Sequence, residues 1–193
     1  MTTQRYEIGM VGLGFMGRNF ALNMADHGHS VVGYDKDTST VDALRKEAAS
    51  RDICGATQLK ECVGLLRVPR AVMMLVPAGP PVDAVIRDLL PSLGHGDLII
   101  DGGNSHFTDT DLRGKTLAER GIQFLGVGVS GGEHGARYAQ ASCPEARAKP
   151  MDGYRQFLRR APPRWTTSLV SPGSVQARPV ITSRWSTTGS NMA

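Results

Sequence analysis

The chain has 193 residues, which is enough for one domain of ordinary size, or for one domain and a fragment. Its first residues are polar and its longest apolar run, residues 71–76, stops at Pro77, so we expect no signal peptide, no membrane partner and a cytoplasmic protein. Cys54, Cys62 and Cys143 lie at no metal-ligand spacing and form no even disulfide set, which predicts reduced thiols and no metal site.

The net charge of +4 is concentrated at one end of the chain. Residues 1–138 contain 14 Lys and Arg against 16 Asp and Glu, whereas residues 139–193 contain 8 against 2. A basic tail can bind nucleic acid. This tail has neither a lysine-rich block nor a helical stripe of charge, so we expect no nucleic-acid partner.

A glycine motif, G-x-G-x-x-G, follows the first predicted strand, residues 6–11, and a helical pattern begins directly behind it. Gly12 allows a sharp turn, Gly14 lets a pyrophosphate approach the backbone, and Gly17 lets the helix pack closely on the sheet. The first turn of the helix then presents N–H groups and a partial positive charge to phosphate. The motif predicts a dinucleotide site, and the alternative is a glycine-rich turn kept only for packing.

The helix behind the motif carries Met16, Phe20 and Met24 at helical spacing. We interpret these side chains as core residues rather than cofactor contacts. Gly28 is expected to end the helix.

The second predicted strand, residues 30–34, ends at Asp35-Lys36-Asp37. An acidic residue at this distance from the glycines accepts hydrogen bonds from the adenosine ribose of NAD, whereas a cation there binds the extra phosphate of NADP. Asp35 therefore favours NAD and Lys36 favours NADP. The alternative is a solvated turn whose charges have no role.

Helical and strand patterns alternate through the next ninety residues. Predicted helices span residues 39–49, 56–66, 82–93 and 108–120, the last capped by Thr108 with Asp111 three residues on, and predicted strands span residues 71–76, 97–101 and 123–129. This alternation predicts an α/β fold with a Rossmann-like, doubly wound, mostly parallel sheet. Polar and glycine-rich clusters follow four strands and should meet in one crevice: residues 12–17, 76–79, 102–105 and 130–133.

Three motifs in this order are more specific: G-L-G-x-M-G-R-N at 12–19, D-G-G-N-S at 101–105 and G-V-S-G-G-E-x-G-A-R at 128–137. Together they closely resemble 6-phosphogluconate dehydrogenase, the decarboxylating enzyme of the pentose phosphate pathway, from residue 8 to residue 138. The resemblance implies an oxidoreductase that uses NADP to convert 6-phosphogluconate into ribulose 5-phosphate.

The resemblance also implies roles for individual residues. It places Asn104 beside both nicotinamide and substrate, and it makes Asn104 and Ser130 the candidate catalytic residues. Ser130, Gly131 and Gly132 would hold the sugar acid, and a V-S-G-G turn at a strand end does offer donors to an anion. The simpler interpretations are an Asx-turn at Asn104 and a serine that bonds only its own backbone. The full set of expected cofactor-binding residues is Gly12, Leu13, Gly14, Phe15, Met16, Gly17, Asp35, Lys36, Val76, Ala78 and Asn104.

The chain departs from the family pattern at three places. Pro77 stands where the family has a lysine in L-V-K-A-G, which removes one donor near the cofactor. Asp35-Lys36-Asp37 replaces the family's common N-R-T, so NAD is possible beside NADP. His134 replaces a second glutamate and is expected at the surface.

The resemblance stops after Tyr138. Residues 139–193 hold 6 of the 11 prolines and no sustained periodicity, so we expect a disordered tail behind a cofactor domain of residues 1–138. Supplying one lost base after the Tyr138 codon would permit family residues over 139–145 and again over 178–193, where the family's K-M-V-H-N-G segment would appear. We therefore interpret the tail as translated out of frame.

In the family, the lysine of that segment is the general acid/base, and the helical domain around it forms most of the homodimer interface. Without them we expect the chain to be inactive. Two rival functions are a β-hydroxyacid dehydrogenase acting on a small acid, against which D-G-G-N-S and G-G-E-x-G-A-R speak, and a non-catalytic dinucleotide-binding protein.

Overall fold

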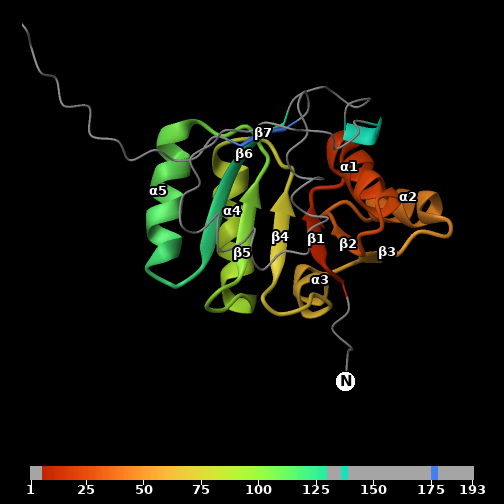
Figure 1. Ribbon diagram of the computed structural model, residues 1–193, viewed down its shortest axis with the longest axis horizontal. Coiled ribbons are helices and arrows are strands. Elements are labelled where there is room, and N and C mark those ends of the chain that lie inside the picture. Colours follow the sequence, from red (N-terminus) through yellow and green to blue (C-terminus); the bar gives the residue numbers. More distant parts are fainter. Residues whose placement is uncertain (1–5, 130–135, 139–174, 178–193) are drawn as a thin grey trace, which may run out of the picture.

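The computed structural model describes residues 6–129, 136–138 and 175–177, and these residues form one sheet covered by helices (Figure 1). The strand order is β3-β2-β1-β4-β5-β6-β7, with β1 to β6 parallel and β7 antiparallel to β6. The strands are β1 (Ile8–Val11), β2 (Val31–Tyr34), β3 (Ile53–Ala56), β4 (Ala71–Met74), β5 (Leu98–Asp101), β6 (Gln123–Val129) and β7 (Val175–Ala177). The doubly wound, Rossmann-like α/β fold predicted from the sequence is confirmed.

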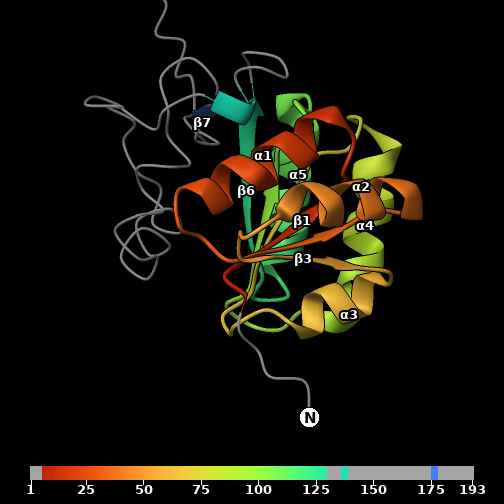
Figure 2. The same cartoon turned by 90° about the vertical axis from the view of Figure 1, so that its right-hand side faces the viewer.

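The helices divide into two groups on the two faces of the sheet (Figure 2). Side chains of α1 and α2 pack with one face, and side chains of α3, α4 and α5 pack with the other. The helices are α1 (Phe15–Asp26), α2 (Thr38–Ala48), α3 (Leu59–Gly64), α4 (Pro80–Leu89), the 3-10 turn η1 (Leu90–Ser92) and α5 (Phe107–Ala118). The expected core residues of α1 are confirmed, because Phe20 and Met24 are buried and Met16 packs against the same cluster.

The central strands are continuous apolar runs, because helices cover both of their faces. Every residue of β1, β4 and β5 is buried, including Met10, Met73 and Ile100. Parallel strands covered in this way show no polar alternation. These strands were therefore predictable from the sequence, although β4 ends at Met74, two residues earlier than expected.

One strand, β3, is absent from the sequence prediction, which instead continued a helix from residue 56. The helix α3 begins only at Leu59, and Ile53–Ala56 pairs in parallel with β2 at the edge of the sheet. The segment I-C-G-A contains a single β-branched residue, so its strand propensity is low. Gly55 is required by packing, because a β-carbon there would lie 2.7 Å from Cγ1 of Val41 on α2.

Two helices, α4 and α5, also differ from the prediction in their bounds. α4 begins at Pro80, since proline is well suited to the first turn, and it ends at Leu89. α5 begins one residue before Thr108, with His106 at its N-cap position and no side-chain cap. The hydroxyl of Thr108 instead meets Nδ1 of His106 at 2.8 Å, so the predicted Thr108 cap is wrong.

Ion pairs close the amino edge of the sheet, where β1, β2, β4 and β5 begin. Glu7 lies 3.0 Å from Nδ1 of His29 and 2.6 Å from Nη2 of Arg67. Asp97 accepts from the backbone N–H of Arg70 at 2.6 Å and pairs with its guanidinium at 3.2 Å. This edge is therefore stabilised by contacts among its own side chains.

Three tail residues are part of the fold, since β7 pairs with β6 between Val129 and Val175 and between Val127 and Ala177. The predicted disorder of the rest of the tail falls outside the described residues and stays a prediction. Within the described ranges no helix is long and apolar enough to cross a bilayer.

Candidate functional site

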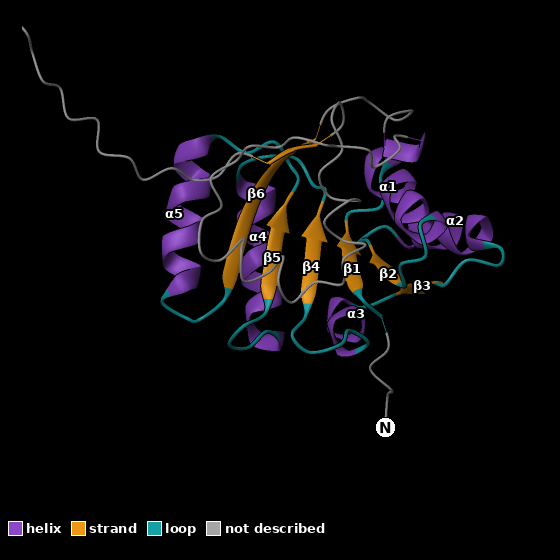
Figure 3. Ribbon diagram, in the orientation of Figure 1, coloured by secondary structure: helices purple, strands orange, loops and turns teal. Residues whose placement is uncertain are grey.

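The carboxyl ends of β1, β4 and β5 point to one edge of the sheet (Figure 3). In a doubly wound sheet, ligands bind at this edge, where the strand order reverses. The reversal lies between β1 and β4. The loops that follow β1, β2, β4 and β5 are therefore the place to examine the predicted residues.

The glycine loop makes a tight turn between β1 and α1. Gly12 has a φ of +90°, and its N–H donates to the carbonyl oxygen of Tyr34 at 2.9 Å. A β-carbon on Gly12 would lie 2.5 Å from the carbonyl oxygen of Leu75, and a β-carbon on Gly17 would overlap the carbonyl oxygen of Gly12. Gly17 thus lets α1 approach the turn itself, rather than the sheet as the sequence suggested.

Gly14 occupies the open side of this loop. No atom lies within 4 Å of where its β-carbon would be, and its φ of −57° is open to any residue. No described side chain caps the first turn of α1, and this turn contains no acidic residue. A helix start that is open and lacks acidic residues can receive an anion. Phe15 is exposed beside it, while Met16 is half-buried.

Asp35 holds the glycine loop from the end of β2. Its Oδ2 accepts from the N–H of Leu13 at 2.6 Å, and its Oδ1 accepts from the N–H of Asp37 at 3.0 Å. The Leu13 side chain is fully buried. Asp37 in turn caps α2 through the N–H of Ser39 at 2.9 Å. Hydrogen bonding by the side chain of Ser39, and then by its N–H, lowers the pKa of Asp37. Lys36 between them is exposed.

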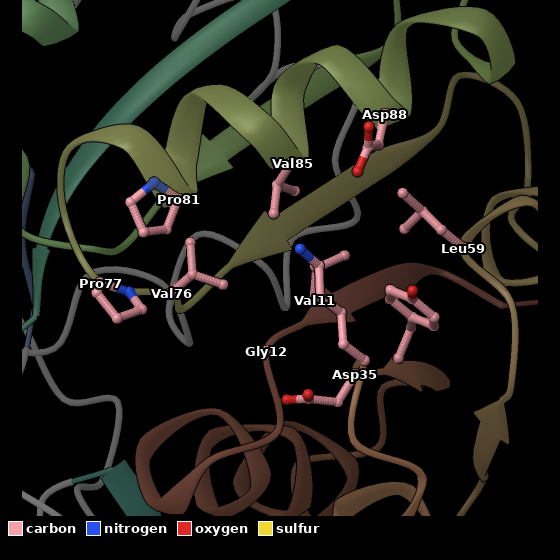
Figure 4. A pocket seen from close by; sticks show the side chains of 11 residues that line it. Val11, Gly12, Asp35, Leu59, Val76, Pro77, Pro81, Val85 and Asp88 are labelled. Atoms are coloured by element: carbon pink, nitrogen blue, oxygen red, sulfur yellow. The ribbon is translucent and has the colours of Figure 1, made fainter.

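A cavity of about 200 Å³ opens beside Asp35, at the carboxyl ends of β1, β2 and β4 (Figure 4). Its wall combines apolar side chains with three charged ones. It is lined by Val11, Gly12, Tyr34, Asp35, Lys36, Leu59, Val76, Pro77, Pro81, Val85 and Asp88. An apolar cavity with a few charged groups is typical of a nucleotide site.

Acidic groups prevail in this cavity. Burial raises the pKa of the Tyr34 phenol, and the nearby carboxylates of Asp35 and Asp88 raise it further. Lys36 is the cation in the wall, and Pro77 supplies none where the family has a lysine. The cavity wall, with Asp35 and Asp88 against Lys36, therefore has a net negative charge.

The loops after β4 and β5 lie against each other. The N–H of Gly102 donates to the carbonyl oxygen of Met74 at 2.9 Å. A β-carbon on Gly103 would lie 2.5 Å from the carbonyl oxygen of Val76, so only glycine fits there. Val76 lines the cavity, and Ala78 lies exposed further along its loop.

A buried carboxylate, Asp101, closes the loop after β5. Asp101 is 1% exposed, and it accepts from the N–H of Gly103 at 2.9 Å and from the hydroxyl of Ser105 at 2.7 Å. The guanidinium of Arg113 lies 3.5 Å from its Oδ2. These contacts leave the turn little freedom.

Asn104 lies in the chain between Gly103 and Ser105. It has a φ of +58°, a conformation that asparagine tolerates better than most residues. Its Nδ2 donates to the carbonyl oxygen of Val129 at 3.1 Å, and its Oδ1 accepts from the N–H of Val129 at 2.8 Å. The side chain therefore joins the loop after β5 to the end of β6, instead of forming only a local Asx-turn. The next residues, Ser130, Gly131 and Gly132, lie outside the described residues, as does His134.

Sequence reasoning missed Arg113, Asp101 and Asp88. Arg113 and Asp88 lie on helices, where a charge is usually solvated, and only the D-G-G-N-S motif pointed toward Asp101. Within the described ranges no group of three or more His, Cys, Asp or Glu side chains could hold a metal ion. The predicted cofactor residues flank the carboxyl edge, and their individual contacts stay predictions.

A doubly wound sheet with an open glycine loop and a carboxylate at the end of β2 defines a dinucleotide-binding domain of the Rossmann class. The family described as the NAD binding domain of 6-phosphogluconate dehydrogenase matches residues 7–161. The chain therefore belongs to the 6-phosphogluconate dehydrogenase family.

Relatives in other organisms agree with this assignment. The chain is 52% identical to the decarboxylating 6-phosphogluconate dehydrogenase of Candida albicans over 155 residues, which is 80% of this chain and 30% of that protein. It is 51% identical to the Haemophilus influenzae enzyme over 139 residues, 72% of this chain and 29% of that protein. The chain thus spans less than a third of the length of these relatives.

Solved structures of related proteins share the fold of this chain. Plasmodium falciparum 6-phosphogluconate dehydrogenase matches with a TM-score of 0.66 and 36% identity, over 69% of this chain and 29% of that one. Mycobacterium tuberculosis 3-hydroxyisobutyrate dehydrogenase matches with a TM-score of 0.65 and 24% identity, over 84% and 52% of the two chains. At that identity the second match concerns the fold alone.

Proposed function

We propose that residues 1–138 are the cofactor domain of a 6-phosphogluconate dehydrogenase and that they bind NADP, or NAD, at the carboxyl edge of the sheet. The observation that carries the proposal is the open face of Gly14 beside the uncapped start of α1. The Plasmodium enzyme was solved with NADP+ and with 6-phosphogluconate, which supports NADP. Asp35 supports NAD instead.

In an intact enzyme of this family, we infer that the nicotinamide takes a hydride from C3 of 6-phosphogluconate, and that the 3-keto acid then loses CO2 to give ribulose 5-phosphate. Asn104 would orient the reacting groups from the end of β5. Ser130, Gly131 and Gly132 would hold the sugar acid by the serine hydroxyl and backbone N–H groups. We also propose that the protein is cytoplasmic.

The experiment that tests cofactor binding uses Gly14→Val. Because a β-carbon at Gly14 meets no protein atom, the fold should persist while the added side chain blocks the pyrophosphate. NADPH or NADH titration should show at least a ten-fold weaker affinity, about 1.4 kcal/mol. Gly64→Val on α3 is the control, since that site is equally open. Equal titration curves for Gly14→Val and wild type would remove the dinucleotide assignment.

We further propose that residues 139–193 are an out-of-frame tail and that this chain lacks the acid/base lysine and most of the homodimer interface. Two observations support this: the last of the three family motifs ends at Arg137, and the chain spans under a third of its relatives. The family match itself runs on to residue 161. A dehydrogenase acting on a small acid gains no support from the 3-hydroxyisobutyrate dehydrogenase match, because 24% identity speaks only for the fold. A non-catalytic dinucleotide-binding role is what the domain would retain by itself.

A further inference from the structure

Arg113 projects from α5 into the protein and is 8% exposed. Its Nε donates to Oδ1 of Asp83 at 2.7 Å, its Nη1 to the hydroxyl of Ser105 at 2.9 Å, and its Nη2 to the carbonyl oxygen of Gly79 at 3.2 Å. A buried guanidinium is costly unless its donors are satisfied. Here the partners come from α4, from the loop after β5 and from the loop after β4.

The contact between Arg113 and Ser105 also helps to hold the neighbouring residue, Asn104. Asp101 binds the Gly103 N–H and the Ser105 hydroxyl, so both neighbours of Asn104 are held. Arg113 completes this arrangement by donating to the same hydroxyl. Since Asn104 binds Val129, the position of the guanidinium also affects how the loop after β5 meets the end of β6.

These loops lie on one side of the point where the strand order reverses. The cavity with Asp35 combines the ends of β1 and β2 with the start of the loop after β4, Gly79 lies further along that loop, and Ser105 follows β5. A dinucleotide in a doubly wound sheet crosses that reversal, with one nucleotide on each half. If its adenosine lies beside Asp35, its nicotinamide end extends toward the loops that Arg113 joins.

We propose that Arg113 is a positioning residue that fixes the loops after β4 and β5 in the arrangement that receives the nicotinamide end of the cofactor. Arg113 does not touch the cofactor itself. The inference rests on the proposed function, because it assumes that the carboxyl edge binds a dinucleotide.

A simple pair between helices would not explain these contacts. The side chain of Asp83 is 59% exposed, so a pair with Asp83 alone could form at the surface. Both Nη atoms instead reach loop oxygens inside the protein. The Arg113 hydrogen bond lowers the pKa of Asp83, and the same bond raises the pKa of Arg113, so the network stays charged at neutral pH.

The test compares a whole cofactor with its adenosine end. Wild type and Arg113→Met are titrated with NADH and ADP, and with NADPH and adenosine 2′,5′-bisphosphate. We expect Arg113→Met to weaken the dinucleotide that the wild type prefers by about ten-fold, because a small misplacement of a contacting group is costly. Its adenosine-end probe should bind within about two-fold of wild type. Arg120→Met, an exposed arginine beyond the end of α5, is the matched control and should change neither affinity.

Two results would overturn the inference: equal losses for the dinucleotide and the adenosine probe, or no loss for either. If Arg113→Met does not fold, Ser105→Ala decides the question, because it removes only the hydroxyl that links Arg113 to Asp101. Ser105→Ala should weaken the dinucleotide selectively, and an unselective loss or no loss contradicts the inference. A wild type that binds no dinucleotide would instead contradict the proposed function.

Discussion

Gly14 and Gly17 lie in the same loop, but the space around them differs. A β-carbon on Gly17 would overlap the Gly12 carbonyl, whereas one on Gly14 would meet nothing within 4 Å. The folded chain therefore requires glycine at position 17 for its own packing. At position 14 it leaves open space, so a substitution there should separate the proposed cofactor binding from stability.

Asp35 makes backbone contacts that the sequence did not predict. The sequence indicated a ribose contact, while the structure shows a carboxylate that holds Leu13 and Asp37 by their N–H groups. These bonds fix the carboxylate in the wall of the cavity, and Asp88 lies in the opposite wall (Figure 4). On the proposed function, a phosphate on the cofactor ribose would meet this negative charge.

Cofactor choice can be tested with Asp35→Asn. The single amide oxygen can still accept from Leu13, although the bond from the N–H of Asp37 is lost, so the glycine loop should persist while the repulsion of a ribose phosphate is removed. Because one charge-assisted contact is worth about 1.5 to 3 kcal/mol, the NADP to NAD affinity ratio should rise about ten-fold or more. Titration with both cofactors measures the ratio.

The control for this experiment is Asp37→Asn, since Asp37 is occupied with the cap of α2. It should leave the affinity ratio unchanged. An unchanged ratio in Asp35→Asn as well would show that Asp35 does not face the ribose.

Among the elements, the strands at the centre of the sheet were predictable and the edge strand β3 was not. Runs such as A-V-M-M in β4 are apolar because both faces are covered. β3 is a strand because it pairs with β2, from Val31 with Ile53 to Tyr34 with Ala56, residues that lie far apart in sequence. The sequence of a short segment does not indicate such a long-range contact.

The candidate site likewise contains residues that could be predicted from the sequence and residues that could not. Gly12, Gly14 and Asp35 follow from a motif whose spacing has a mechanical cause. Arg113 carries no such signal, because a single arginine in a polar helix pattern is usually exposed. Its burial became visible only when α4 and the two loops were placed around it.

The short helix α3 contains a buried thiol that should make the stability of the domain depend on pH. Cys62 lies fully buried under β2, with its Sγ 3.7 Å from the carbonyl oxygen of Val32. Burial raises the pKa of the Cys62 thiol from 9.0 to about 12. Between these values the unfolded chain releases a proton that the folded chain keeps, so the free energy of unfolding should fall by about 1.4 kcal/mol per pH unit.

Urea unfolding at pH values from about 8 to about 11 measures this slope. Cys62→Ala should lose that part of the slope, while Cys54→Ala, whose thiol is only half-buried, should keep it. A slope that is the same in wild type and Cys62→Ala would show that the thiol ionises as readily folded as unfolded.

At the scale of the whole molecule, the chain corresponds to less than a third of its relatives. The relatives are more than three times as long in sequence as the part matched here. Asn104 is exposed at the crevice. In water, hydrogen bonds to a substrate are weak and orient it poorly.

We expect the 193-residue chain to show no turnover of 6-phosphogluconate. General acid/base catalysis typically contributes about 10² to 10⁴ in rate, and the family lysine that supplies it belongs to the K-M-V-H-N-G segment that this frame does not encode. Reduction of NADP or NAD is followed by absorbance of the reduced cofactor.

The comparison chain is one in which a single base is restored after the Tyr138 codon and the open frame is extended. It should reduce the cofactor when 6-phosphogluconate is added. Turnover by the purified short chain, or a restored chain that folds but stays inactive, would contradict this interpretation.

The ion pairs of Glu7, His29 and Arg67 lie at the opposite end of the strands from Asp35 and Asn104. A four-residue strand separates the two edges by about 13 Å, a distance at which mutational effects usually add. Substitutions that raise heat tolerance at the amino edge should therefore leave the proposed cofactor site unchanged. The same separation would let the domain be attached to an electrode or a fluorescent reporter through its amino edge while the proposed site faces the solution.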